Sequence, residues 1–164
     1  MAFTQPYNVS EIRPVVRLDK FAQDVDAAEA LNADAVTIGV TAGTTSADTA
    51  AQRFPLAQIT EFPTHEEAAR ALMDGRTMAF VGSTPFPELL VAAAPEQLAI
   101  GSEEPLRTTV EAFAVPQGEP ILLTFLNNWI DAVSAEGFIA SSRLEWFDAE
   151  PPEEPAAPAQ PAPQ

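Results

Sequence analysis

The sequence contains no cysteine and little positive charge. The absence of cysteine excludes disulfides, thiolate metal sites and a cysteine nucleophile. Eight basic residues stand against 24 acidic ones, which gives a formal net charge of -16 at pH 7. A nucleic-acid backbone needs a positively charged partner surface, so we expect no nucleic-acid binding. The acidic residues are spread along the chain, a distribution typical of a solubilising surface.

Other classes of site also lack the residues they need. His65 is the only histidine, and without a cysteine or second histidine it predicts no metal site. No apolar run approaches the ~18 residues of a membrane-spanning helix. Residues 1–7 show no basic region followed by an apolar one, so we expect no signal peptide in this chain. We therefore predict no metal site.

The most informative stretch is residues 36–48, VTIGVTAGTTSAD. Its β-branched residues alternate up to Val40 and predict a strand with one apolar face. Gly43 permits a turn, and Thr44 and Thr45 are good N-caps for a following helix. The free N–H groups and hydroxyls of such a helix start can bind a carboxylate or phosphate. An ordinary capped turn remains the alternative.

The rest of the pattern alternates strands with helices. Thr64 and Glu67 form a capping box, and Gly75 is placed to end that helix. This alternation predicts an α/β domain with a mainly parallel sheet. The expected strands are 12–18, 36–40, 58–62, 77–81, 97–100 and 108–115. The expected helices are 21–31, 45–53, 64–74, 121–133 and 138–147, with another that has Pro85 in its first turn and contains residues 89–91.

Two turns that carry hydroxyl groups follow two of the expected strands. Thr44 and Thr45 follow one strand, and Ser83 or Thr84 is expected to cap the helix after another, with Pro85 in its first turn. Ligands of parallel sheets gather at the carboxyl ends of strands. The candidate ligand site therefore comprises Gly43, Thr44, Thr45, Ser83 and Thr84.

The C-terminal part changes character twice. Residues 121–133 carry the strongest helical apolar stripe of the chain. Trp129 and Trp146 lie on apolar stripes and are predicted to be core residues, with stacking against a ligand as the alternative. Six of the chain's 16 prolines lie in residues 151–164, a composition that predicts a disordered tail.

Four motifs together resemble one family, the type II periplasmic solute-binding proteins of the polar amino-acid class that serve ABC importers. Residues 3–7 (FTQPY) resemble its FS-x-PY signature, and residues 38–45 (IGVTAGTT) resemble VGVQxGTT. Residues 68–81 (AARALMDGRTMAFV) resemble ALQALxxGRxDAVV, and residues 135–147 (AEGFIASSRLEWF) resemble ADGTYxKIxxKWF. The matches occur in the family's order and spacing, and their joint occurrence is fairly specific.

The resemblance implies two α/β lobes joined by crossover strands, with the ligand closed between them. This chain is then expected to hold a complete second lobe and part of the first, without the family's signal peptide, early first lobe or carboxylate-gripping arginine. Near the implied hinge, Tyr7 and Arg17 are expected to support the crossover, and the alternative is that they line the cleft. The implied divisions are 1–15 as lead-in and first crossover strand, 16–107 as lobe 2, 108–147 as the returning part of lobe 1, and 148–164 as a disordered Pro/Ala-rich tail.

The resemblance also implies a function. It suggests the periplasmic substrate-binding component of an ABC importer, whose partners are a small carboxylate-bearing solute and a membrane permease. Such a component is expected to have no cofactor and no catalytic residue. The family's ammonium-binding aspartate aligns with Ser83, whose neutral hydroxyl cannot make the same charge-assisted bond. An enzyme similar to cyclohexadienyl dehydratase, or a truncated lobe acting as an interaction module, remains an alternative.

Overall fold

The computed structural model describes residues 1–21 and 27–148. None of the helices in these ranges is long and apolar enough to cross a membrane. The elements are β1 (Ala2–Phe3), β2 (Asn8–Arg17), α1 (Ala27–Ala30), β3 (Thr37–Thr41), α2 (Thr45–Arg53), β4 (Gln58–Phe62), α3 (His65–Met73), β5 (Ala79–Ser83), α4 (Phe86–Ala93), β6 (Leu98–Ile100), β7 (Arg107–Glu111), β8 (Ala114–Val115), α5 (Pro120–Ala135), α6 (Phe138–Arg143) and the π-helical turn η1 (Leu144–Asp148).

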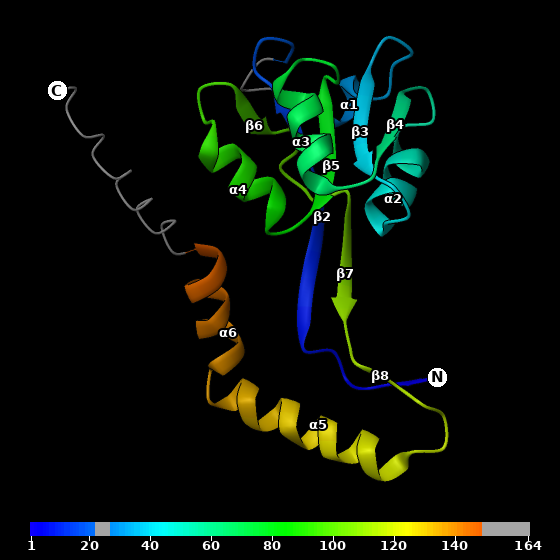
Figure 1. Ribbon diagram of the computed structural model, residues 1–164, viewed down its shortest axis with the longest axis vertical. Coiled ribbons are helices and arrows are strands. Elements are labelled where there is room, and N and C mark those ends of the chain that lie inside the picture. The colour runs from blue at the N-terminus through cyan, green and yellow to red at the C-terminus, as the bar shows by residue number, and fades with distance from the viewer. Residues whose placement is uncertain (22–26, 149–164) are drawn as a thin grey trace, which may run out of the picture.

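A six-stranded sheet forms the centre of the α/β unit (Figure 1). The strand order is β4-β3-β5-β2-β6, and β7 also pairs with β2. β3 is parallel to β4 and β5, whereas β2 is antiparallel to β5, β6 and β7. The α/β class is confirmed. The expectation of a mainly parallel sheet is wrong, because β2 enters between β5 and β6 in the opposite direction and makes the sheet mixed.

Helices cover both faces of this sheet. On one face, Ile12 and Val16 of β2 pack with Ile38, Val40 and other residues near α1 and α2. On the other face, Val15 packs with Leu72 of α3 and with residues near α4. The alternation of β2 side chains between two buried faces explains why Pro14, Val15 and Val16 form an uninterrupted buried apolar run.

The helix caps divide into confirmed and corrected predictions. Thr44 and Thr64 each accept a hydrogen bond from the backbone N–H three residues on, and Gly75 has a φ of 73° after α3. Neither Ser83 nor Thr84 caps α4, whose N-cap position is Pro85. The hydroxyl of Thr84 instead accepts a hydrogen bond from the backbone N–H of Glu11, at 3.1 Å.

Other differences lie at element boundaries. The expected strand 108–115 is divided into β7 and β8, and the expected strand 77–81 begins two residues later. Of the expected helix 21–31, residues 22–26 lie outside the described residues and α1 covers only the last turn. The predicted tail lies outside the described residues from position 149 onward.

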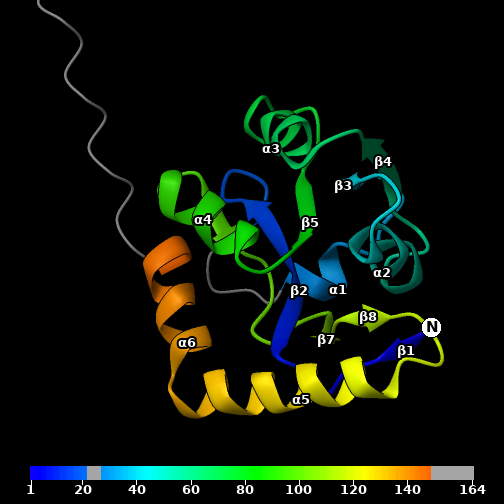
Figure 2. The ribbon, with the colours of Figure 1, turned by 60° about the horizontal axis from the view of Figure 1, so that its bottom comes forward.

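β2 and β7 leave the α/β unit together and lead to the C-terminal helices (Figure 1). There α5 runs beneath the short β1–β8 pair (Figure 2). Gln5 joins the two, since its backbone N–H donates to the side chain of Asn127 at 2.9 Å and its side chain donates to Asp131 at 2.6 Å. At the other end of β2, Arg17 donates to the carbonyls of Leu72 and Met73, both at 2.9 Å, and so supports the end of α3.

The apolar stripe of α5 is largely exposed. Ile121 is 85% exposed and Phe125 64% exposed, whereas Ile130 is buried. Trp129 and Trp146 are 42% and 77% exposed, so the prediction that they are core residues is wrong. Their stripes are apolar as predicted, but the described part of the chain supplies no element that covers them.

We expect this surface to bind hydrophobic dyes and to favour self-association, because soluble monomers rarely expose so large an apolar patch. The double substitution Ile121→Ser and Phe125→Ser should reduce both dye fluorescence and the apparent mass in light scattering. Leu56→Ser removes an apolar residue that is 61% exposed elsewhere and serves as the matched control. A monodisperse unaltered chain that leaves the dye dark would contradict this prediction.

Candidate functional site

The turn between β3 and α2 is built by Gly43 and Thr44. Gly43 has a φ of 69°, a conformation that favours glycine. The Thr44 hydroxyl donates to the carbonyl of Thr41 at 2.7 Å and accepts from the N–H of Ala47 at 3.3 Å. Its single proton is therefore engaged in holding the turn, and Thr44 shapes the site more than it offers a free donor.

The first turn of α2 provides the donors that remain. The N–H groups of Thr45 and Ser46 lie where an α-helix has no intrahelical acceptor for them. Thr45 is exposed, so its hydroxyl can reach a ligand. These groups and the positive end of the helix dipole suit a carboxylate or another small anion.

The structure brings the two hydroxyl-bearing turns together through Ser46. Its hydroxyl oxygen lies 3.3 Å from that of Ser83 at the end of β5. Ser46 is buried and was missed by the sequence analysis, which considered only the threonines before it. Ser46 follows Thr45 directly in the first turn of α2. This position in the sequence could have identified it as a further hydroxyl of the site. The site therefore lies at the carboxyl ends of the adjacent parallel strands β3 and β5, and it brings together Gly43, Thr44, Thr45 and Ser83.

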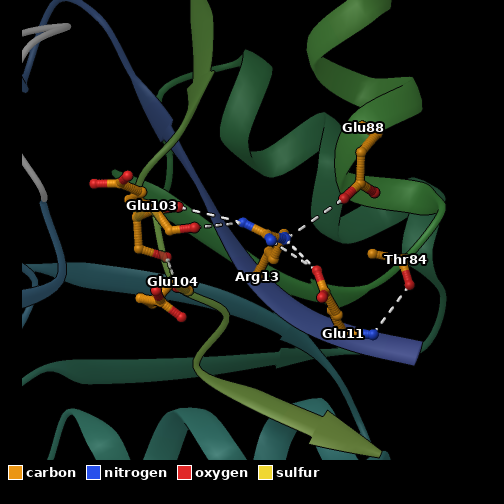
Figure 3. A network of polar contacts seen from close by, with 7 residues as sticks. Glu11, Arg13, Thr84, Glu88, Glu103 and Glu104 are labelled. Atoms are coloured by element: carbon orange, nitrogen blue, oxygen red, sulfur yellow. Dashed lines mark hydrogen bonds and ion pairs between the residues drawn. The ribbon is translucent and has the colours of Figure 1, made fainter. Parts of the chain in front are cut away.

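Thr84 faces a different set of partners. It exchanges two hydrogen bonds with Glu11, one of which runs from its own N–H to the Glu11 carbonyl at 2.8 Å. Arg13 extends this network (Figure 3) by pairing with Glu11 at 2.7 Å and approaching Glu88 at 3.9 Å. It also donates to the carbonyl of Glu103 at 3.1 Å. This network ties β2 to the start of α4, and Thr84 acts there as a support.

A cavity of about 470 Å³ lies between the β2–β7 pair and the helices α5 and α6, and Thr84 forms part of its wall. Aromatic side chains form much of its walls, and two charged residues, Glu111 and Arg143, lie among them. The Glu111 carboxylate accepts hydrogen bonds from the Ser10 hydroxyl and, at 3.0 Å, from the Asn8 amide. These two bonds, with a smaller contribution from the Arg143 charge, lower the pKa of Glu111 below its ordinary value. We call this cavity the Glu111 pocket.

We predict that Ser10→Ala raises the pKa of Glu111, because it removes the strongest hydrogen bond to the ionised form. A lowered pKa in the folded state contributes stability above the pKa of the unfolded chain, and that contribution is lost as pH falls through the folded value. Carboxyl NMR titration should show the rise, and the loss of stability on acidification should become shallower. An unchanged Glu111 titration would contradict the assignment.

Comparisons with known proteins find similar solved structures but no match by sequence. No family model matches the sequence, and no curated protein matches it. An ancestral amino-acid-binding protein, a precursor of cyclohexadienyl dehydratase, matches 88% of this chain and 60% of its own with a TM-score of 0.74 and 28% identity. A putative ABC-transporter binding component from Wolinella succinogenes, complexed with lysine, covers 90% of this chain and 63% of its own with a TM-score of 0.81 and 20% identity. A cysteine-binding protein from Campylobacter jejuni covers 87% and 55%, with a TM-score of 0.72 and 24% identity.

The chain therefore has a periplasmic-binding-protein-like type II fold, present in part. Its structural neighbours are type II periplasmic amino-acid-binding proteins, which confirms the resemblance seen in the motifs. The chain spans 60% of the length of the first of these structures. Most of the neighbours are binding proteins and not enzymes.

Proposed function

We propose that this chain is the substrate-binding component of an ABC importer and binds a small carboxylate-bearing solute between two lobes. The observation that carries the proposal is the meeting of the α2 N-terminus with the end of β5, where the Ser46 and Ser83 hydroxyls are 3.3 Å apart. The carboxylate would accept from the N–H groups of Thr45 and Ser46 and from the Thr45 hydroxyl. The space around Gly43 is open, since a Cβ built there would meet no atom within 4 Å. A ligand can therefore approach the backbone of this turn closely.

A helix N-terminus suits this acidic chain for a physical reason. Arg13, the basic residue closest in sequence to the Glu11–Thr84 contact, is already engaged by Glu11 and by backbone carbonyls. Backbone N–H groups bind an anion without a free basic side chain. The proposed partners are the solute and a membrane permease, and the proposed location is the periplasm.

We propose binding without chemistry in preference to a dehydratase activity. An acid catalyst must hold a proton near the working pH, and residues 82–86 contain no ionisable acid. Glu111 lies nearby, but its lowered pKa keeps it ionised and makes it a poor proton donor. A role as an interaction module alone would leave the helix N-terminus without a ligand.

We expect Thr45→Ala to weaken carboxylate binding by about 1 kcal/mol, roughly fivefold in Kd, through loss of one hydrogen bond. The measurement is chemical-shift mapping of the 164-residue chain titrated with L-amino acids and the matching deaminated acids. Shifts should centre on the amides of residues 43–46. Thr60→Ala, on the exposed part of β4, is the matched control. If no carboxylate moves the amides of residues 43–46, the proposed site is wrong.

Ser83→Asp should change the ligand preference. A carboxylate at the end of β5 would supply a charged acceptor beside the helix N-terminus and favour ligands that carry an α-ammonium group. The same titration panel should then shift toward plain amino acids relative to the deaminated acids. Tight binding of an unmodified amino acid by the unaltered chain, unaffected by the change at Ser83, would contradict the role given to this residue.

A further inference from the structure

The Glu111 carboxylate in the Glu111 pocket is held in place by two side-chain hydrogen bonds, and the packing of the fold does not require a charge there. Its oxygens accept from Asn8 and Ser10 on the paired strand. An ionised carboxylate offers about four acceptor positions, so two donors leave it unsaturated. Among residues 1–21 and 27–148, no cation forms an ion pair with Glu111 within 4 Å.

Arg143, whose charge acts on Glu111, also lines the Glu111 pocket and hydrogen-bonds to Asn8. Its guanidinium donates to the Asn8 side-chain oxygen at 3.4 Å, while the Asn8 amide nitrogen donates to Glu111. Arg143 therefore contacts the Asn8 amide, and within the described residues it forms no ion pair with the Glu111 carboxylate.

The walls of the Glu111 pocket suit an apolar body that carries a positive charge. The rings of Tyr7 and Phe113 are stacked with centroids 4.7 Å apart, and Phe113 lies 6.3 Å from Trp129. Trp146 also lines the pocket. Aromatic faces attract organic cations through their quadrupoles, and a volume of about 470 Å³ falls in the range of small-molecule sites.

The strand register relates this pocket to the proposed carboxylate site. Ser83 lies opposite Ile12, and Glu111 lies opposite Asn8, which precedes Ile12 by four residues on β2. Side chains of directly opposed residues share a face of the sheet, and residues an even number apart on one strand also share a face. Ser83 and Glu111 therefore lie on the same face of β2.

We propose that Glu111 receives an organic ammonium group on an aromatic or alkyl body, at a position separate from Ser83. The further identification of this cation as part of the transported solute rests on the proposed function. Binding forms the charge-assisted contact to the open carboxylate positions and covers the exposed faces of Trp129 and Trp146.

The first test compares two probes on the unaltered 164-residue chain. The probes are 2-phenylethylamine, which is cationic at neutral pH, and 2-phenylethanol, which has the same ring and chain without the charge. The readout is the indole N–H signals of Trp129 and Trp146. We expect the amine to shift both signals with an affinity at least about tenfold higher than that of the alcohol, as for a hydrogen bond to a charged group. Equal affinities would overturn the proposal.

The second test removes the charge at Glu111. Glu111→Gln keeps the shape and should weaken amine binding at least about tenfold, while binding of the alcohol stays unchanged. Glu61→Gln is the matched control, since it makes the same change in net charge on the distant β4 strand. Equal weakening in both variants would show attraction to the acidic chain as a whole and would overturn the site.

The two proposals can fail separately. If carboxylates shift the amides of residues 43–46 but the amine binds independently of Glu111, the inference is wrong and the proposed function stands. If the amine requires Glu111 but no carboxylate reaches the α2 N-terminus, the Glu111 pocket stands as a cation site and the proposed function is wrong.

Discussion

The pairing of β2 with three other strands holds the described structure together. The C-terminal half of this ten-residue strand lies between β5 and β6, and its N-terminal half pairs with β7. Its side chains enter the packed layers on both faces of the sheet. A shift of its register by one residue would reverse every one of these side chains, so the buried apolar residues at both faces fix the register strongly. That register in turn sets Ser83 and Glu111 on one face.

The charged side chains around the site differ in whether they are already paired. The chain is strongly acidic, and Arg13 is bound by Glu11, by backbone carbonyls and, at longer range, by Glu88. Anion binding is then left to backbone N–H groups, which carry no net charge and need no basic side chain. The Glu111 carboxylate, by contrast, is stabilised by neutral donors and keeps its charge available for a ligand. The α2 N-terminus and the Glu111 pocket thus offer opposite polarities along one face of β2.

Local patterns predicted much of this arrangement. The βα turn at Gly43, the caps at Thr44 and Thr64 and the α5 helix depend on interactions within a few residues, and each is found where the sequence placed it. The motifs also identified the fold that the structural comparisons confirm. The assignment of Ser83 or Thr84 as a cap failed because Thr84 bonds instead to Glu11, which lies 73 positions away in sequence. No local pattern contains such a contact.

The sequence by itself determined the period of each strand and helix, the acidity of the surface and the hydroxyl-rich turns at the strand ends. Those properties follow from residue type and near neighbours. Only the tertiary structure decided the direction of β2 within the sheet, the contact of Ser46 with Ser83 and the exposure of Trp129. It also decided the surroundings of Glu111, whose carboxylate is bound by residues about 100 positions away. Burial and long-range hydrogen bonds depend on which strands meet, and that is a property of the whole packed chain.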